Sequence, residues 1–245
     1  MKTVRGLAST DVRRGRGTTF SSGTVSVGVT DVPDPHGDQP VERTGVQPAE
    51  ANASVVLVHG RGARARGMLD FAQEIHRDDV HYVAPQAARG TWYPQSFMAP
   101  VEANEPYLTS ALDRLATVLD DLNGAGIPPE HVVLLGFSQG ACLTSEYAAR
   151  NARRYGGVVA LSGGLIGPDG TEFEYDGSMG GTPAFLGCGD QDPHIPVERV
   201  EETALVFANR DADVEKRIYE GMGHGVIPDE IEYVRELVGN VASRD

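Results

Sequence analysis

Short apolar runs alternate along the chain with longer stretches in which apolar residues recur every three or four positions. The runs predict buried strands, and the longer stretches predict amphipathic helices. Strands are expected at residues 54–58, 80–84, 131–135, 157–161, 183–187 and 214–219, and helices near residues 68–75, 108–122, 139–150, 197–209 and 228–238. This alternation specifies an α/β fold, with a mostly parallel central sheet covered by helices on both faces.

The N-terminal region follows a different pattern. Residues 1–23 are rich in Arg, Gly, Ser and Thr without apolar periodicity, which predicts a flexible tail. Residues 24–30 alternate apolar and polar side chains, as in a half-exposed strand. We therefore expect a single domain over residues 24–245, a usual size for one domain. The basic N-terminus lacks the apolar stretch of a secretory signal, and no apolar run approaches the roughly 18 residues of a membrane span.

Charge narrows the function classes. The chain has 35 acidic and 21 basic residues, a formal net charge of −14, and only two of the basic residues are lysines. A nucleic-acid binder would need a basic surface, so we expect that this protein does not bind nucleic acid. The composition resembles that of proteins from a high-salt cytoplasm, and arginine-rich codon usage is the alternative explanation. Two isolated cysteines, Cys142 and Cys188, fit a reduced, cytoplasmic location.

Residues 133–141 (VLLGFSQGA) contain the candidate nucleophile. They predict a buried strand that ends in G-x-S-x-G, with Ser138 at the centre. A serine hydroxyl needs a base to take its proton and a backbone that exposes it to the substrate. Gly136 and Gly140 let the chain turn sharply from strand into helix, which leaves the hydroxyl above the sheet edge. A simple strand-to-helix turn is the alternative, but the position of the motif favours a serine hydrolase.

The order nucleophile, acid, histidine then identifies the other candidates. His224 lies among glycines in residues 221–225, after one predicted strand and before the last helix. Asp190 and Asp192 follow the strand at residues 183–187, and the residues alone do not choose between them. The D-x-D-x-H spacing also resembles a metal site, but a calcium loop needs further oxygen ligands that this segment lacks. We therefore expect no metal.

Two backbone N–H groups are needed to bind the oxyanion that forms during ester cleavage. One is expected from Gln139, directly after the nucleophile, and the other from Arg61 in the H-G-R-G loop after the strand at residues 54–58. The Arg61 side chain is expected to be solvated or to meet an anionic part of the substrate. The long loop at residues 85–103 predicts a binding segment. The candidate acyl-pocket residues are Trp92, Tyr93, Phe97 and Met98, together with Leu165 and Ile195.

Five segments together resemble the phospholipase/carboxylesterase family, which includes the acyl-protein thioesterases. They are residues 57–63 (LVHGRGA), 136–141 (GFSQGA), 160–165 (ALSGGL), 189–200 (GDQDPHIPVERV) and 221–225 (GMGHG). The resemblance begins near residue 54 and extends to the C-terminus. It implies an α/β-hydrolase fold, Asp192 as the catalytic acid, the Arg61 amide in the oxyanion hole and a groove for an acyl chain. Arg61 departs from the leucine that is usual in the family.

These observations lead to one expected function. The protein is expected to be a cofactor-independent serine hydrolase that cleaves short- to medium-chain carboxylic esters through an acyl-enzyme. Thioester or lysophospholipid cleavage at the same site is the alternative, and a catalytically silent binding protein is another, because a fold does not dictate function. The expected partner is a small-molecule ester, with no nucleic acid and no membrane span, and a homodimer is the assembly to be tested.

Overall fold

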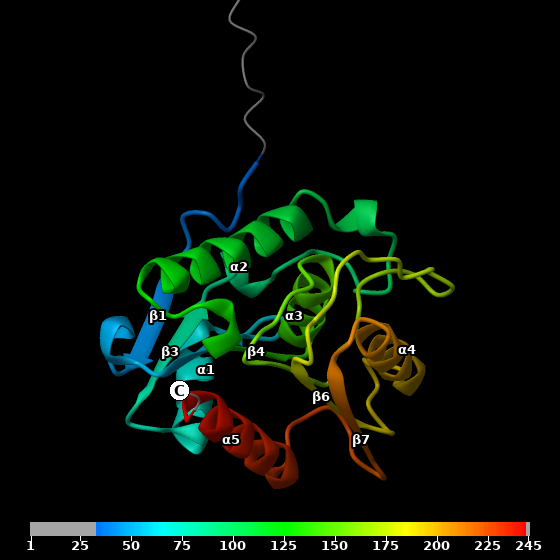
Figure 1. Ribbon diagram of the computed structural model, residues 1–245. Helices are drawn as coiled ribbons and strands as arrows, with labels where there is room; N and C mark the ends of the chain where they lie inside the picture. The colour runs from blue at the N-terminus through cyan, green and yellow to red at the C-terminus, as the bar shows by residue number, and fades with distance from the viewer. Residues whose placement is uncertain (1–32, 244–245) are drawn as a thin grey trace, which may run out of the picture. The chain divides into compact units, whose positions relative to one another are not determined.

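A seven-stranded sheet runs through residues 33–243, the part of the chain that the computed structural model describes (Figure 1). The strands lie in the order β1-β3-β2-β4-β5-β6-β7. Only β1 runs antiparallel to its neighbour, and the other pairs are parallel. The strands are β1 (Val41–Gly45), β2 (Ala53–Val58), β3 (Val80–Pro85), β4 (Val132–Phe137), β5 (Gly157–Leu161), β6 (Pro183–Gly189) and β7 (Asp213–Tyr219).

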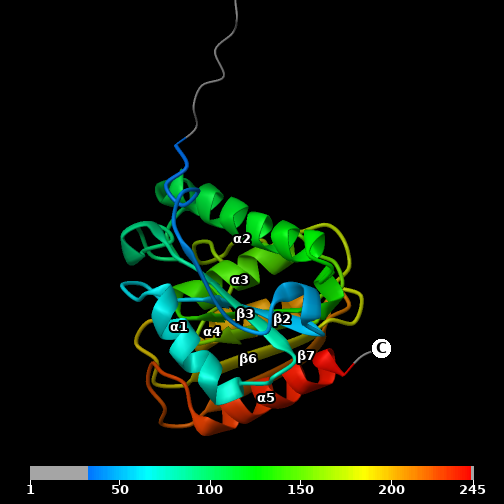
Figure 2. The same ribbon diagram turned by 90° about the vertical axis from the view of Figure 1, so that its left-hand side faces the viewer.

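Helices cover both faces of this sheet (Figures 1 and 2). One face carries α1 (Ala65–Ala72) and α5 (Pro228–Ala242), and the other carries α2 (Tyr107–Gly124), α3 (Gln139–Arg150) and α4 (Val197–Ala208). The predicted α/β class, with a mostly parallel sheet between two helical layers, is confirmed. Short 3-10 turns complete the described elements, at Pro48–Glu50, Gln73–Ile75, Ala88–Gly90, Val101–Asn104 and Pro129–His131.

The central strands position the candidate site. All six residues of β2 are buried, as are the first five of β4, because helices cover both sides of this part of the sheet. In the parallel register Val58 lies opposite Gly136, so β2 and β4 end at the same level. Loops that follow neighbouring parallel strands meet at the carboxyl edge of the sheet, where ligands bind in open α/β sheets. The segments after β2 and β4 therefore lie next to each other.

The longest described helix, α2, buries the apolar stripe that the sequence predicts for it. Its buried side chains recur at helical spacing, and they include Leu108, Leu115 and Leu122. In the described part of the chain, no helix is both long and apolar enough to cross a membrane.

The structure differs from the sequence-based expectation at the edge of the sheet. Strand β1 was not predicted, because its residues VERTG have little apolar character and are only half-buried or exposed. His131 was expected in a strand but belongs to a 3-10 turn before β4. The predicted tail at residues 1–23 and the predicted strand at residues 24–30 both lie outside the described residues.

Candidate active site

Ser138 lies between the end of β4 and the start of α3. Its backbone has φ 55° and ψ −121°, a conformation that residues other than glycine rarely adopt. Two neighbouring glycines make this turn possible. A Cβ on Gly136 would lie 2.2 Å from the Gly140 carbonyl oxygen, and a Cβ on Gly140 would lie 2.1 Å from that of Val58. Only glycine fits at either position, and the result is a strained, partly exposed serine.

His224 and Asp192 come together from the loops after β7 and β6. The two atoms His224 Nδ1 and Asp192 Oδ2 are 2.7 Å apart. The second carboxylate oxygen of Asp192 accepts hydrogen bonds from the backbone N–H groups of His194, at 2.9 Å, and Ile195, at 3.1 Å. The Asp192 side chain is fully buried, whereas 20% of the His224 side chain is exposed. Asp192 is therefore held in place on both of its oxygens.

The environment of Asp192 favours its ionised form. Burial by itself would raise the pKa of this carboxyl group, but the hydrogen bonds from His224, His194 and Ile195 outweigh burial and lower the pKa. Because the pKa of folded Asp192 lies below its ordinary value, the side chain stays charged at neutral pH. A charged carboxylate accepts the Nδ1 proton of His224 and leaves Nε2 free to act as a base.

Asp190, the other candidate acid, has a different role. Its Oδ1 atom accepts a hydrogen bond of 2.7 Å from the backbone N–H of Gly221, at the start of the loop that carries His224. In the described structure its side chain forms no hydrogen bond with the imidazole, and the residue is exposed. Asp190 thus holds the start of this loop, and of the two aspartates only Asp192 is hydrogen-bonded to His224.

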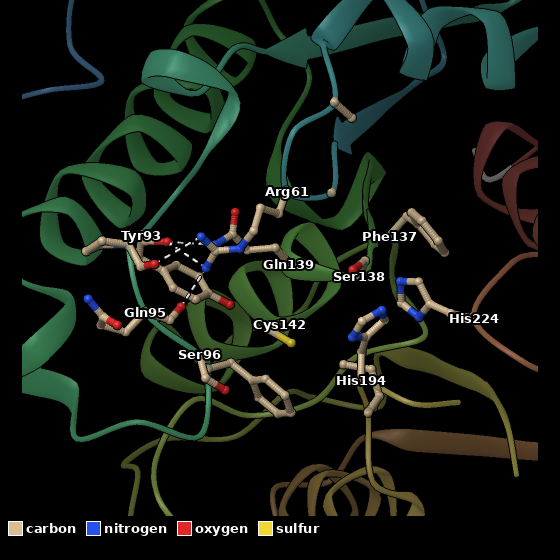
Figure 3. A pocket seen from close by; sticks show the side chains of 15 residues that line it. Arg61, Tyr93, Gln95, Ser96, Phe137, Ser138, Gln139, Cys142, His194 and His224 are labelled. Carbon is tan, nitrogen blue, oxygen red and sulfur yellow. Dashed lines mark hydrogen bonds between the residues drawn. The ribbon is translucent and has the colours of Figure 1, made fainter. Parts of the chain in front are cut away.

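Ser138 and His224 line the same cavity of about 580 Å³ (Figure 3). The Phe137 ring lies against His224, with ring centroids 5.0 Å apart, and His194 meets it edge-on at the same separation. Packing against these two rings holds the imidazole in place at the side of the cavity. The cavity therefore brings together the candidate nucleophile and a carboxylate-bound histidine.

The loop after β2 approaches the nucleophile closely. A Cβ on Gly60 would lie 3.3 Å from the Ser138 Cβ, so the H-G-R-G segment packs directly against the serine. Gln139 begins α3, and the first N–H groups of a helix have no partner within it. The backbone N–H groups of Arg61 and Gln139 donate to no backbone carbonyl in residues 33–243 outside the regular elements. Both are free to bind an oxyanion beside Ser138.

The Arg61 side chain is exposed, and its guanidinium also donates to three backbone carbonyls of the neighbouring loop (Figure 3). The sequence did not predict these bonds. The distances are 3.0 Å to Tyr93, 3.0 Å to Pro94 and 2.6 Å to Gln95. The Gln139 side chain adds a further bond of 2.8 Å to the Tyr93 carbonyl. The same residues that present the two amides thus fasten the segment at one side of the cavity.

This arrangement predicts the effect of Arg61→Leu. The variant removes three charge-assisted bonds and loosens residues 93–95, while the backbone N–H of residue 61 remains. We expect KM for a neutral ester to rise about tenfold, since a hydrogen bond to a charged group contributes about 1.5–3 kcal/mol and these bonds are partly exposed. Steady-state kinetics would show a much smaller change in kcat.

Arg61→Lys is the matched variant, because it keeps the charge but not the forked donors. It should show an intermediate KM. A fall in kcat of about 10²-fold or more at unchanged KM would contradict this role, and would mean that the side chain shapes the oxyanion hole itself.

The expected acyl-pocket residues divide into two groups. Tyr93, Phe97 and Ile195 line the cavity. Trp92, Leu165 and Met98 do not. Trp92 is fully buried, and its indole N–H donates to the His59 carbonyl at 2.8 Å. Leu165 is fully buried in the core. Met98 lines a separate hollow beside Arg199. The aromatic composition of the loop did not show which rings face inward.

The structure also adds residues that the sequence did not single out. Cys142 lines the cavity one helical turn after Ser138, and that spacing could have revealed it. Burial raises the pKa of Cys142 to about 12, so its thiol stays protonated and is a poor nucleophile. His194 also lines the cavity, two positions after Asp192. Both help to define the walls around Ser138.

Similar proteins share this fold and layout. Residues 42–241 match the sequence model of the Phospholipase/Carboxylesterase family. Acyl-protein thioesterase 1 of Saccharomyces cerevisiae is 28% identical over 217 residues, which cover 79% of this chain and 93% of the yeast protein. Phospholipase/carboxylesterase from Dyadobacter fermentans superposes with a TM-score of 0.78 at 41% identity, covering 82% of this chain and 96% of its own. Bacillus cereus carboxylesterase, at 17% identity and a TM-score of 0.66, shares the fold over 84% of this chain and 95% of its own. The predicted α/β-hydrolase fold is confirmed.

Proposed function

The chain belongs to the Phospholipase/Carboxylesterase family of hydrolases, and from this premise we propose that it is a serine esterase that cleaves carboxylic esters through an acyl-enzyme. The observation that carries the proposal is the 2.7 Å contact between His224 and buried Asp192, in the cavity that Ser138 also lines. The strained backbone of Ser138 supports it further, because such strain persists where the surrounding structure holds a reactive group in place.

The proposed reaction has two halves. His224 Nε2 takes the proton of Ser138 as the Oγ atom attacks the ester carbonyl, while Asp192 stabilises the resulting imidazolium. The N–H groups of Arg61 and Gln139 bind the oxyanion, and its collapse breaks the bond to the alcohol, which leaves with the proton from His224. Water then attacks the acyl-enzyme with His224 again as base, and the acid product departs from Ser138.

The shape of the cavity supports short- to medium-chain acyl groups. Its volume of about 580 Å³ lies within the usual range for small-molecule sites. Its lining includes Cys142 and Tyr93, both almost fully buried, and the apolar side chains of Phe97 and Ile195. An acyl chain of a few carbons can contact these apolar side chains within this volume, whereas a long chain would have to extend beyond the cavity.

Thioester cleavage is the second candidate. One observation favours it, namely the similarity to yeast acyl-protein thioesterase 1 over most of both chains. The same nucleophile, base and oxyanion amides would serve a thioester, since the steps at the carbonyl are the same. A catalytically silent binding protein is disfavoured, because binding alone gives no reason for a strained serine beside a histidine–carboxylate pair.

Two of the earlier expectations extend this proposal. We place the protein in the cytoplasm, which is supported by Cys142 and Cys188, both buried and unpaired as thiols in the described structure. The substrate would be a small-molecule ester, in keeping with the volume of the cavity.

A panel of p-nitrophenyl esters, from acetate to palmitate, tests the proposal. We expect kcat/KM to be highest for short and medium acyl chains and to fall for long ones, and a parallel thioester series would measure the alternative. A fluorophosphonate probe should label Ser138 and no other serine. Absence of labelling, together with no turnover of any ester, would rule out the proposed activity.

A further inference from the structure

Two segments around the candidate site contain no acidic residue, although acidic residues greatly outnumber basic ones in the chain as a whole. Residues 51–69 and 80–101 contain neither Asp nor Glu. They hold four arginines, namely Arg61, Arg64, Arg66 and Arg89. None of the residues that line the catalytic cavity is a carboxylate either. The surface of the catalytic cavity thus carries no carboxylate, although the protein has a net charge of −14.

Three of these arginines line a second hollow next to the catalytic cavity. It has a volume of about 460 Å³ and is lined in part by Arg64, Arg66 and Arg89. Ala63 lines both the hollow and the catalytic cavity, so the two spaces adjoin at the loop that carries the Arg61 amide. Glu42 is the one carboxylate among the lining residues. The hollow therefore has an excess of positive charge.

The three arginines are free to bind a ligand. Arg64, Arg66 and Arg89 are all exposed, and none of them forms an ion pair with a carboxylate in residues 33–243. Five arginines elsewhere in the described structure do have acidic partners, among them Arg77 with Asp79 and Arg217 with Asp229. On a surface this acidic, unpaired cations gathered around one hollow indicate an anionic occupant.

The backbone at Arg89 is an independent indication of a built site. Its φ of 54° and ψ of 19° are left-handed, a conformation that costs a non-glycine residue free energy and that clusters at ligand sites. The turn is held to the oxyanion loop by a hydrogen bond of 2.7 Å from the Gly62 N–H to the Gly90 carbonyl. Arg89 is thereby kept at a constant position relative to the segment that presents the Arg61 amide.

We propose that the hollow lined by Arg64, Arg66 and Arg89 binds an anionic group of the substrate, so that the preferred substrates are esters that carry a carboxylate or a phosphate. This inference rests on the proposed esterase function and narrows its substrate class. The planar guanidinium matches the geometry of both anions and can bind either through two parallel hydrogen bonds. Because the protein as a whole is strongly acidic, the three arginines would provide a local positive field that guides anionic substrates to this hollow.

Matched pairs of esters test this proposal. p-Nitrophenyl hydrogen glutarate and p-nitrophenyl pentanoate differ by a charge at the end of the acyl group, and 4-carboxyphenyl acetate and 4-methylphenyl acetate differ by a charge on the leaving group. The measured quantity is the ratio of kcat/KM for the anionic ester to that for its neutral partner. We expect the ratio to exceed one for at least one pair, and that pair shows on which side of the scissile bond the anion lies. Inorganic phosphate should compete with the preferred anionic ester and raise its apparent KM.

Substitutions of the arginines test whether the preference for anionic esters depends on the hollow. The double variant Arg64→Gln/Arg66→Gln should lower the ratio about tenfold, since an exposed ion pair contributes up to about 1 kcal/mol. Arg89→Asn should lower it as well, and asparagine tolerates the left-handed backbone. Arg153→Gln is the control, because Arg153 is equally exposed but lies after the far end of α3 and lines neither space. The control should keep the wild-type ratio.

Salt gives a second readout of the same charge. The screening length falls from about 30 Å at 0.01 M to about 3 Å at 1 M salt, so the wild-type ratio should fall over this range of KCl. Taking a ratio cancels any effect of salt on the amount of folded enzyme. A ratio near one for both pairs, or a ratio that the arginine substitutions leave unchanged, would overturn the proposal.

Failure of this inference can be told apart from failure of the esterase function. If the neutral esters are hydrolysed and the ratios do not respond, only the anion site is refuted. If no ester is hydrolysed, the binding of glutarate measured by titration calorimetry still decides the matter. Weaker binding by the double variant than by the wild type would support the site, and equal or absent binding in both would overturn it.

Discussion

The Ser138→Ala variant is expected to lose about 10⁴- to 10⁶-fold in kcat, because nucleophile, base and acid act as a unit and the loss of one removes most of their joint effect. The variant keeps the Cβ atom, so the backbone at φ 55° and the close contacts of Gly136 and Gly140 are preserved. Its stability should therefore remain close to that of the wild type. Steady-state kinetics on a p-nitrophenyl ester and a thermal melt would measure both effects.

The same helix offers a control for this experiment. Ser145 lies on α3 and is buried, its hydroxyl has no hydrogen-bond partner in the described structure, and it does not line the cavity. Ser145→Ala should leave kcat unchanged and should not lower the melting temperature, because it removes an unsatisfied buried hydroxyl. Appreciable turnover by Ser138→Ala, measured beside this control, would exclude Ser138 as the nucleophile.

The second large effect is expected for Asp192→Asn, a loss of about 10⁴-fold in kcat. Asp192 Oδ2 lies 2.7 Å from His224 Nδ1 and accepts its proton. An asparagine can place its NH₂ group there, which forces Nδ1 to accept and moves the proton to Nε2. The imidazole then has no lone pair with which to deprotonate Ser138. Because the substitution is isosteric, the bonds from the backbone N–H groups of His194 and Ile195 can persist, and the fold should remain intact.

Asp190→Asn is the matched comparison, two positions away on the same loop. Its carboxylate accepts only the backbone N–H of Gly221, and an amide oxygen can replace it there. We expect a loss of at most a few fold in kcat, through a less rigid loop around His224. Steady-state kinetics on one neutral ester would compare the two variants directly. A larger loss for Asp190→Asn than for Asp192→Asn would transfer the acid role to the other aspartate.

The sequence by itself determined the elements of the fold and the order of the candidate residues. The apolar runs at β2 and β4 and the leucine spacing of α2 predict strand and helix within windows of a few residues, because burial on two faces or on one stripe leaves a local pattern. The G-x-S-x-G motif after an apolar run identified the turn at Ser138, because its glycines and the buried strand before it are also local features of the sequence. A strand without such a pattern, β1, was missed.

Only the tertiary structure decided which side chains meet. Asp190 and Asp192 are alike in sequence. The path of the loop after β6 places Asp190 against the Gly221 N–H and Asp192 against the His224 imidazole. The partners of Arg61 lie more than thirty positions away, so no local pattern could show that its guanidinium binds backbone carbonyls. The arginines of the second hollow come from two separate segments, one after β2 that includes the start of α1 and one after β3. Contacts of this kind depend on strand order and register, which place distant segments together, whereas periodicity specifies only the elements between them.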